Sequence, residues 1–285
     1  MVLKIGIIYI LNRNFAQNNL KMKLSVYLFV VCLTVLVAAC GPSDEDKARV
    51  KVNFAKVLLE QQDTAQALQQ LDSVALLFPK ARYSASAAKN MISEINFDLL
   101  KRNETELDSV LAQITRLENS FDKEKTEYDR YIQYTHKNQK LQHSVNRTYI
   151  QAHLDEKGEM FISSNYYGKN SINHYSLRVY DADISAKTDS IPVGDNNNHQ
   201  SDFMEYKWEK VSYRNGKDKG VTEFIVNNAD RKLKAAFFGK GQAFIILEEF
   251  DKKAVKDALT LSKAIKRKTV LEKEVQILHK KLNIE

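Results

Sequence analysis

The sequence predicts an α+β protein in which a β-rich domain is inserted between two helical regions. Residues 47–145 contain one proline and no glycine, and their apolar side chains recur every three or four positions, as on one face of a helix. After Asn146 the composition changes to short aromatic and β-branched segments separated by Gly and Asn turns, as far as Phe250. Residues 251–285 return to helical spacing. We therefore expect a helical region at 47–145, a β-rich head at 146–250 and a C-terminal helix at 251–285.

Residues 1–39 are predicted to be a leader with a signal peptide. The apolar stretch 24–39 follows Met22 closely and ends before Cys40, and its 16 residues fall short of the roughly 20 that a membrane span needs. Small residues precede the cysteine, as a signal peptidase requires, and acidic sequence follows it. This pattern resembles the signal of bacterial lipoproteins. The resemblance implies a start at Met22, cleavage after residue 39 and lipidation of Cys40, the alternative being an uncleaved anchor.

A lipidated Cys40 would hold the protein on a lipid bilayer. Two or three acyl chains, at ~0.8 kcal/mol per buried methylene, make such anchoring essentially permanent. Residues 40–46 form a short acidic tether, in which Gly41 differs from the acidic second residue that retains lipoproteins at the inner membrane. The run Ser43-Asp44-Glu45-Asp46 resembles the export signal of surface lipoproteins in Bacteroidota. We expect an outer-membrane location at the cell surface, with the periplasmic face as the alternative.

Charge and cysteine content argue against several classes of protein. The chain has 43 Lys and Arg against 36 Asp and Glu, but four of the basic residues lie in the leader, so no nucleic-acid partner is expected. The two cysteines are Cys32, in the leader, and Cys40. The six histidines show no short metal-ligand spacing, and no catalytic constellation or phosphate loop is evident. We therefore expect no enzyme activity, no metal and no cofactor.

The first part of the helical region is predicted to form a helical hairpin. Two helical segments, 53–60 and 65–74, flank the turn 61–63. Small side chains at Ala55 and Ala67 let the two helices approach, and leucines fill the space between them. This pattern resembles a tetratricopeptide (TPR) hairpin. Only one such unit is evident, whereas a stable array needs about three, so we expect a single TPR-like hairpin.

Two longer segments show the heptad spacing of a coiled coil. One runs from Ala81 past Tyr131, and the other covers residues 261–282. Residues 91–130 contain six basic and ten acidic residues, whereas residues 251–282 contain ten basic and four acidic ones. Because opposite charge favours pairing, we expect an antiparallel coiled-coil stalk that carries the head at its tip. The alternative is that each helix simply has a solvated face.

Apolar and aromatic runs predict the strands of the head. The expected strands cover residues 149–154, 160–162, 174–180, 203–213, 221–226, 233–238 and 243–247. Turns rich in Asn and Gly separate them, since these residues tolerate positive φ. So many short strands in about 105 residues predict a small antiparallel β-sandwich or barrel.

The layout as a whole resembles an uncharacterised family of Bacteroidota lipoproteins. The resemblance rests on the segments 162–168 (ISSNYYG) and 172–174 (INH), together with the helical C-terminus. It implies an envelope lipoprotein and carries no known activity with it.

Aromatic side chains of the head suggest a ligand site. Tyr166, Tyr167 and His174 lie in one stretch with several asparagines, and Tyr206 and Trp208 share one strand face at i and i+2. Flat aromatic faces beside amide groups are suited to stacking on a sugar and hydrogen bonding to it. The candidate ligand-binding residues are therefore Tyr166, Tyr167, His174 and Trp208. The alternative is that these rings fill the core of the head.

Four short matches resemble the Asp-Ser/Thr-aliphatic sequon of O-glycosylation in Bacteroidota. The candidate residues are Thr64, Ser73, Ser109 and Ser190. Three of them lie in predicted helices, where Asp-Ser can equally be a cap or an exposed face.

These observations favour a non-enzymatic binding or interaction module of the cell envelope, whose head binds a glycan or a protein. The alternative is a structural adaptor that scaffolds an envelope protein complex through the TPR-like hairpin and the coiled coil. An adaptor is expected to co-purify with envelope proteins, whereas a glycan-binding protein is expected to bind polysaccharide alone.

Overall fold

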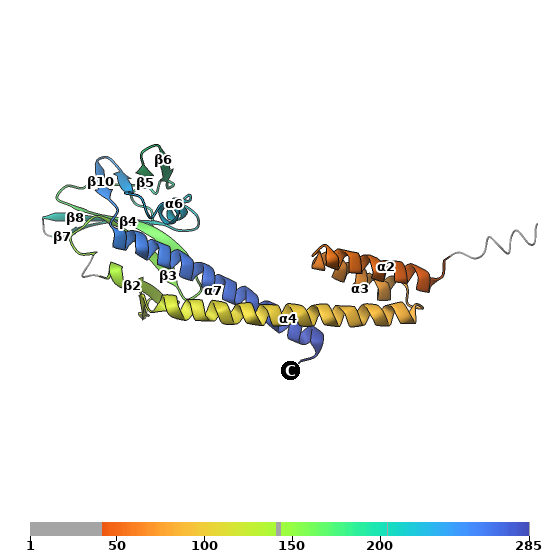
Figure 1. The fold of residues 1–285 in the computed structure, drawn as a ribbon. Coiled ribbons are helices and arrows are strands. Elements are labelled where there is room, and N and C mark those ends of the chain that lie inside the picture. Colours follow the sequence, from red (N-terminus) through yellow and green to blue (C-terminus); the bar gives the residue numbers. More distant parts are fainter. Residues whose placement is uncertain (1–41, 141–143, 204, 285) are drawn as a thin grey trace, which may run out of the picture. The chain divides into compact units, whose positions relative to one another are not determined.

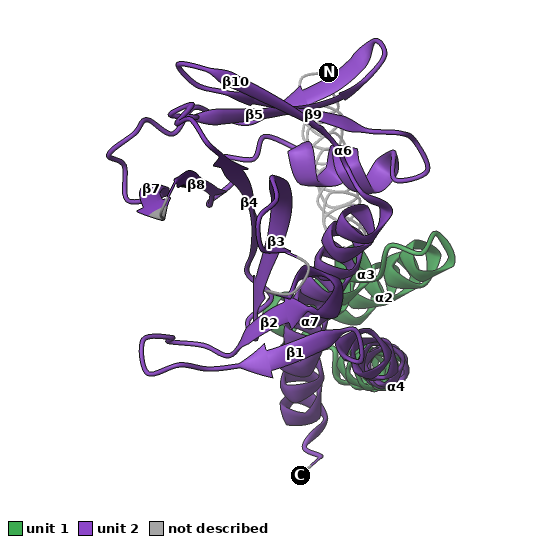
Figure 2. Cartoon of the chain, turned by 90° about the vertical axis from the view of Figure 1, so that its left-hand side faces the viewer, with its two compact units in different colours: residues 1–98 green, residues 99–285 purple. Residues whose placement is uncertain are grey.

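The structure, a computed structural model, describes residues 42–140, 144–203 and 205–284 (Figure 1). The predicted leader and Cys40 lie outside the described residues, so lipidation stays a prediction. The chain divides into two compact units, residues 1–98 and 99–285 (Figure 2). This division falls inside a helix and not at residue 146, where the composition of the sequence changes.

The first unit contains the predicted helical hairpin. Helix α2 (Asp44–Glu60) packs against helix α3 (Thr64–Leu77). The side chains of Ser43 and Asp63 cap the two N-termini by accepting hydrogen bonds from N–H groups three residues on, at 3.2 and 3.0 Å. The buried side chains of the pair are small or aliphatic: Ala48, Val52, Ala55, Leu58, Ala67, Leu71 and Val74. The prediction of a two-helix hairpin is confirmed.

Helix α4 (Arg82–Glu118) ends sooner than the heptad spacing predicts. The residues that follow form a β-hairpin of β1 (Phe121–Glu124) and β2 (Gln133–His136). Phe121 is buried, and its ring meets the ring of His136 edge-on at 4.9 Å between centroids. Burial of Phe121 in the core of the second unit thus overrides its helical spacing. The prediction that the helical region extends to residue 145 is therefore wrong.

Six strands form one antiparallel sheet in the order β1-β2-β3-β4-β8-β7. Besides β1 and β2, its strands are β3 (Tyr149–Asp155), β4 (Met160–Gly168), β7 (Asn198–Phe203) and β8 (Tyr206–Tyr213). The strands predicted at 149–154 and 160–162 are confirmed, although β4 is longer than expected, and of the single strand predicted at 203–213 the part at 206–213 is confirmed as β8. The polar strand β7 was not predicted.

A second antiparallel sheet has four strands in the order β10-β9-β5-β6. They are β5 (Ser176–Asp181), β6 (Ile184–Lys187), β9 (Lys234–Phe238) and β10 (Gln242–Ile246). Both sheets end in edge strands, so no barrel closes among the described residues and the barrel prediction is wrong. A sandwich is not confirmed either, because a helix packs on the six-stranded sheet.

That helix is α7 (Glu249–Leu282), whose first half contacts β3 and β4 (Figure 1). Its second half meets α4 through polar side chains. Arg267 donates two hydrogen bonds to the Glu106 carboxylate, at 2.6 and 2.7 Å, and His279 Nε2 lies 3.2 Å from a Glu104 oxygen. The six-stranded sheet covers the apolar side chains of the first half of α7. This helix is therefore not simply part of a stalk, and the coiled-coil stalk is not confirmed.

Helix α6 (Val221–Asn227) replaces the strand that was predicted at 221–226. The β-branched residues of this segment favour a strand locally. In the structure Val221 and Ile225, four residues apart on one helical face, are completely buried, and the helix packs against α7. Tertiary packing therefore decides the conformation of this segment.

Strand alternation gives the six-stranded sheet two different faces. One face belongs to a core shared with α6, α7 and the second sheet, and it includes Ile150, Leu154, Ile162 and Val211. The opposite face, here called the open face, carries polar and aromatic side chains from the intervening positions. Within residues 42–140, 144–203 and 205–284, this side of the sheet is thus left without an apolar layer.

Candidate functional site

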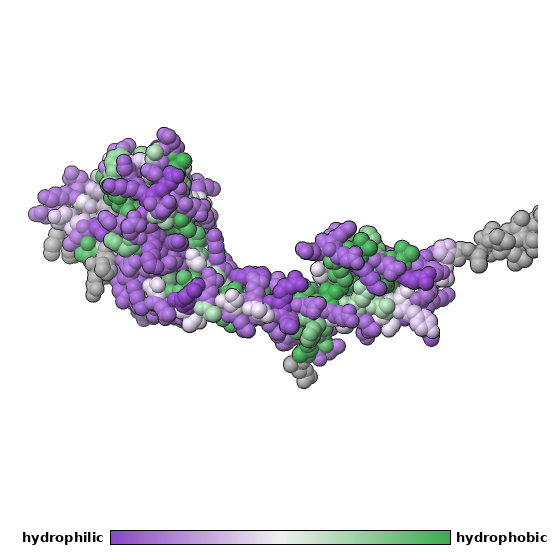
Figure 3. Space-filling view, viewed as in Figure 1, coloured by the Kyte–Doolittle hydropathy of each residue, from purple (hydrophilic) through white to green (hydrophobic). Residues whose placement is uncertain are grey.

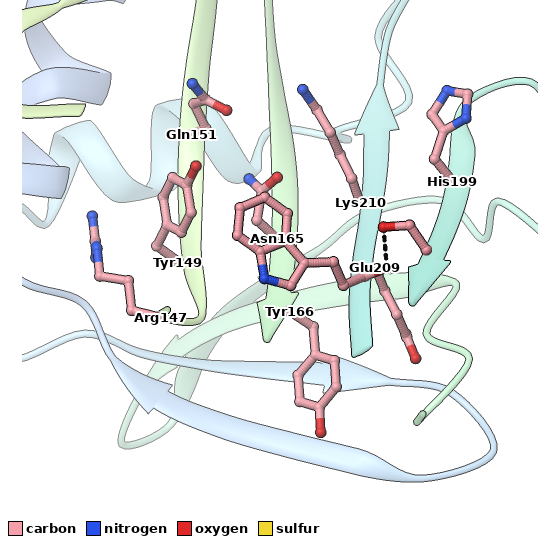
Figure 4. Close-up of a pocket in the computed structure, with 10 residues that line it drawn as sticks. Arg147, Tyr149, Gln151, Asn165, Tyr166, His199, Glu209 and Lys210 are labelled. Carbon is pink, nitrogen blue, oxygen red and sulfur yellow. Dashed lines mark hydrogen bonds between the residues drawn. The ribbon is translucent and has the colours of Figure 1, made fainter. Parts of the chain in front are cut away.

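A cavity of about 290 Å³, here called the hollow, lies on the open face (Figure 4). Cross-strand pairing places Tyr149 opposite Asn165, Asn165 opposite Lys210, and Lys210 opposite His199. Directly paired residues point to the same face of a sheet, so these four side chains form a row across β3, β4, β8 and β7. Further lining residues include Arg147, Gln151, Ser201 and Trp208.

An aromatic platform borders the hollow. The rings of Tyr167 and Tyr206 stack at 4.7 Å between centroids, with 12° between their planes. Trp208 meets Tyr167 edge-on at 6.1 Å. The Trp208 residue is 40% exposed, so its ring remains accessible to a ligand. The structure therefore brings together two of the predicted ligand residues, Tyr167 and Trp208.

Arg147 is held at the hollow by a buried carboxylate. Its guanidinium donates to both oxygens of Asp251 at the start of α7, at 2.6 and 2.8 Å. It also lies 4.4 Å from the ring centroid of Tyr149. Asp251 accepts a third hydrogen bond, of 3.0 Å, from Gln139 in the short 3-10 helix η1 (Lys137–Gln139). The charge of Arg147 is thus balanced within the protein.

Lys210 is in a different electrostatic position. It is half-buried, and within the described ranges no carboxylate lies at ion-pair distance from its ammonium group. Burial, and then the charge of Arg214, lower the pKa of Lys210. Burial, and then the charges of Lys210 and Arg214, hold the pKa of His153 well below its usual range. The open face therefore has a positive potential around Lys210.

A buried polar network lies on the core side of the same strands. The Glu209 carboxylate accepts hydrogen bonds from the backbone N–H groups of Ile172, Asn173 and His174, at 2.7 to 2.8 Å, and from His174 Nδ1 at 2.7 Å. Burial raises the pKa of Glu209, but the hydrogen bonds, those from His174 first, lower it to about 2. Glu209 therefore ties the loop at 171–174 to strand β8.

Glu209, His174 and Ser164 are connected in the same way as a Ser-His-acid triad, since His174 Nε2 lies 2.9 Å from Ser164 Oγ. A triad needs its serine at a site that substrate can reach. Ser164 and His174 are completely buried, and Ser164 Oγ also lies 3.0 Å from the Tyr213 hydroxyl. The geometry therefore indicates a network that holds β4, β8 and a loop together.

The side chains of the other two predicted ligand residues do not point into the hollow, although Tyr166 is among the residues that line it. His174 is part of the buried network, and the Tyr166 side chain points away from Asn165 and Lys210 (Figure 4). The Tyr166 hydroxyl donates to the Asn170 carbonyl oxygen at 2.9 Å. Strand alternation is the reason, because neighbours such as Tyr166 and Tyr167 must point to opposite faces.

Sequence reasoning missed the charged and amide residues of the hollow as a group. Lys210 follows Trp208 at i+2 on β8, so strand alternation alone was a usable signal for it. No local pattern marked Arg147, which lies just before β3 and is placed by Asp251 from the far end of the chain. His199 lies in a polar run without apolar alternation, so no strand pattern marked it.

The predicted glycosylation residues differ in exposure. Ser109 in α4 and Ser190 between β6 and β7 are exposed, whereas Thr64 and Ser73 in α3 are half-buried. The Ser73 hydroxyl donates to the Gln70 carbonyl oxygen at 2.7 Å. Modification at these four positions stays a prediction.

No family model, curated protein or solved structure shows a significant match to this chain. No helix in the described part of the chain is both long enough and apolar enough to cross a membrane. Within the same residues, no group of three or more His, Cys, Asp or Glu side chains is arranged to hold a metal ion. The functional argument therefore rests on the geometry of the hollow.

Proposed function

We propose that this protein is a lipid-anchored carbohydrate-binding protein of the cell envelope, and that it holds a sugar residue in the hollow. The observation that carries the proposal is the aromatic platform of Tyr167, Tyr206 and Trp208 beside a row of polar side chains on an open sheet face. An exposed Trp ring backed by a pair of half-buried tyrosines and set next to amide groups is typical of surfaces that bind sugars.

The chemistry of a sugar ring matches this arrangement. Its C–H face is apolar and packs against aromatic rings, while its hydroxyl groups need hydrogen-bond donors and acceptors. Asn165 and Gln151 supply both from their amide groups. The volume of about 290 Å³ is at the lower end of the range for small-molecule sites, which suits a single sugar residue of a longer chain.

Binding is favoured over hydrolysis because of where the carboxylates lie. A glycosidase needs two carboxyl groups on either side of the scissile bond. Among the described residues that line the hollow, Glu209 is the one with a carboxylate, and this group is taken up by the loop at 171–174 on the core side.

The sequence signal around Cys40 supports membrane attachment. Helix α2 begins at Asp44, so the tether from Cys40 to the first helix spans at most about 14 Å. We therefore expect a lipid on Cys40 to hold the helical hairpin close to the bilayer. Metabolic labelling with palmitate tests this part of the proposal, since wild type is expected to incorporate label and Cys40→Ala to lose it.

A glycan array probed with the full-length lipidated protein in detergent micelles tests sugar binding. Wild type is compared with Trp208→Ala and with Tyr128→Ala, a control that removes an aromatic residue which is 89% exposed between β1 and β2. We expect wild type and the control to bind the same glycans and Trp208→Ala to lose at least about tenfold in affinity. Absence of glycan binding by wild type would contradict the proposal.

A specific observation favours the adaptor as a second candidate. Val50, Phe54 and Val57 follow one another at i, i+4 and i+7 on α2 and are 67%, 49% and 44% exposed. Figure 3 shows apolar residues at the surface of this helical hairpin. A photo-crosslinker at position 54 is expected to capture a defined envelope protein if the hairpin is a scaffold, and one at the exposed Lys56 serves as the control.

A further inference from the structure

Charge on the open face points to a class of sugar. Lys210 and His199 line the hollow, whereas Arg214, whose charge acts on Lys210, lines a separate cavity, where its guanidinium lies 3.6 Å from the ring centroid of Phe161. Burial lowers the pKa of Arg214 and the carboxylate of Asp155 raises it, but that carboxylate already accepts two hydrogen bonds of 2.9 Å from N–H groups of its own turn. The positive charge of this face is therefore not balanced by an acid at the hollow itself.

Lys210 is the cation that this arrangement leaves for a ligand. Arg147 is neutralised by Asp251. Lys207 points to the other face of β8 and pairs with Asp202 at 2.6 Å. A half-buried ammonium group without a counter-charge is unfavourable, and an anion in the hollow would relieve that penalty.

We infer that the hollow selects an anionic saccharide, and that Lys210 binds its carboxylate or sulfate group while Trp208 stacks on the ring. This inference rests on the carbohydrate binding proposed above. Lys210 and Trp208 are two residues apart on one face of β8, which corresponds to about 7 Å along a strand. That separation is comparable to the length of a hexose ring with an exocyclic acidic group.

A saccharide with one acidic group fits the hollow better than a polyanion such as a nucleic acid or an acidic membrane. Nucleic acids and acidic membranes are bound by several unpaired cations that track successive phosphates. Here Arg147 and Lys207 are already paired within the protein, which leaves Lys210 as the cation in the wall of the hollow next to the aromatic platform. The arrangement thus combines one charge with one stacking surface.

The test measures binding of the full-length protein in detergent micelles to polygalacturonate, to its methyl ester, to κ-carrageenan, which carries sulfate but no carboxylate groups, and to a single-stranded oligonucleotide. We expect wild type to bind one of the two acidic polysaccharides at least about tenfold more tightly than the methyl ester, as one charge-assisted hydrogen bond predicts. Which acidic polysaccharide binds distinguishes a carboxylate ligand from a sulfate ligand.

Three variants test whether Lys210 is responsible for the preference for the acidic polysaccharide over the methyl ester. Lys210→Met is expected to lose at least about tenfold in affinity for the acid and to bind the ester unchanged, whereas Lys210→Arg keeps the preference. Lys207→Met, on the same strand but the other face, is expected to behave like wild type. Thermal melts of each variant show whether a loss of binding reflects a loss of folding.

The possible failures are distinguishable. Equal affinity for acid and ester, or binding to neutral glycans alone on the array, overturns the anionic assignment and leaves the proposed function standing. No binding to any glycan overturns both. Affinity for the oligonucleotide equal to that for the acidic polysaccharide overturns the assignment to a saccharide. A preference for acid that survives in Lys210→Met overturns the role of that residue.

Discussion

Glu209 and Lys210 are neighbours in the chain, yet the two faces of one sheet give them opposite environments. On the core face, Glu209 accepts hydrogen bonds from Ser171 and from the chain at 172–174, and its carboxylate is fully paired. On the open face, Lys210 is half-buried without a carboxylate partner in the described residues. Folding requires pairing where water is excluded, whereas a sheltered charge without a partner on an accessible face indicates a ligand.

Removing Glu209 is expected to have the largest effect on stability and tests the difference between the two faces of the sheet. Glu209→Ala leaves several buried N–H donors without an acceptor, so we expect the free energy of unfolding to fall by about 3–5 kcal/mol. Lys210→Met, one position away, is expected to change it by less than about 1 kcal/mol. Urea denaturation of the full-length protein measures both, and equal losses would contradict the distinction between the faces.

A second comparison separates the two cations of the hollow. Arg147→Met leaves the Asp251 carboxylate buried without its bidentate partner, and we expect a loss of about 3 kcal/mol. The matched control is again Lys210→Met. If Arg147→Met is as stable as wild type, the pairing with Asp251 does not hold α7 and the hollow together, and Arg147 becomes a second candidate for binding the anion.

Low pH tests the same difference between the faces, because it protonates the Glu209 carboxylate. Its pKa of about 2 in the folded protein lies below its ordinary value of 4.5, so its contribution to stability is present above pH 4.5 and is lost as the pH falls towards 2. At pH 3 this loss is expected to be about 2 kcal/mol relative to pH 7. Denaturation curves for wild type and Glu209→Gln at both pH values give the difference, which should be absent if Glu209 is not the group responsible.

The smallest effect on stability is expected at the aromatic platform. Trp208→Ala removes an exposed ring, so we expect the free energy of unfolding to change by less than about 1 kcal/mol. Sugar binding is nevertheless expected to fall by at least about tenfold. A large loss of stability, seen by urea denaturation, would show that Trp208 packs the fold instead of serving a ligand.

Elements whose partners are close in sequence were predicted well. The α2 and α3 hairpin follows from small residues such as Ala55 and Ala67 between two helical runs, and β3 follows from its alternation and the turn after it. Segments whose conformation depends on distant partners were not predicted well. Val221 and Ile225 form a helix because α7 covers them, and Phe121 leaves the helical pattern because a core formed largely by residues after 146 buries it.

The candidate site also has a part that local sequence predicts and a part that depends on distant partners. The spacing of Tyr206, Trp208 and Lys210 on β8 is enough to place the three side chains on one face, because successive residues of a strand alternate. No local pattern shows whether that face is covered. The packing of α7 against the other side of β3 and β4, and of the loop at 171–174 against Glu209 on β8, decides this, so that Glu209 is buried and Lys210 is left accessible to a ligand.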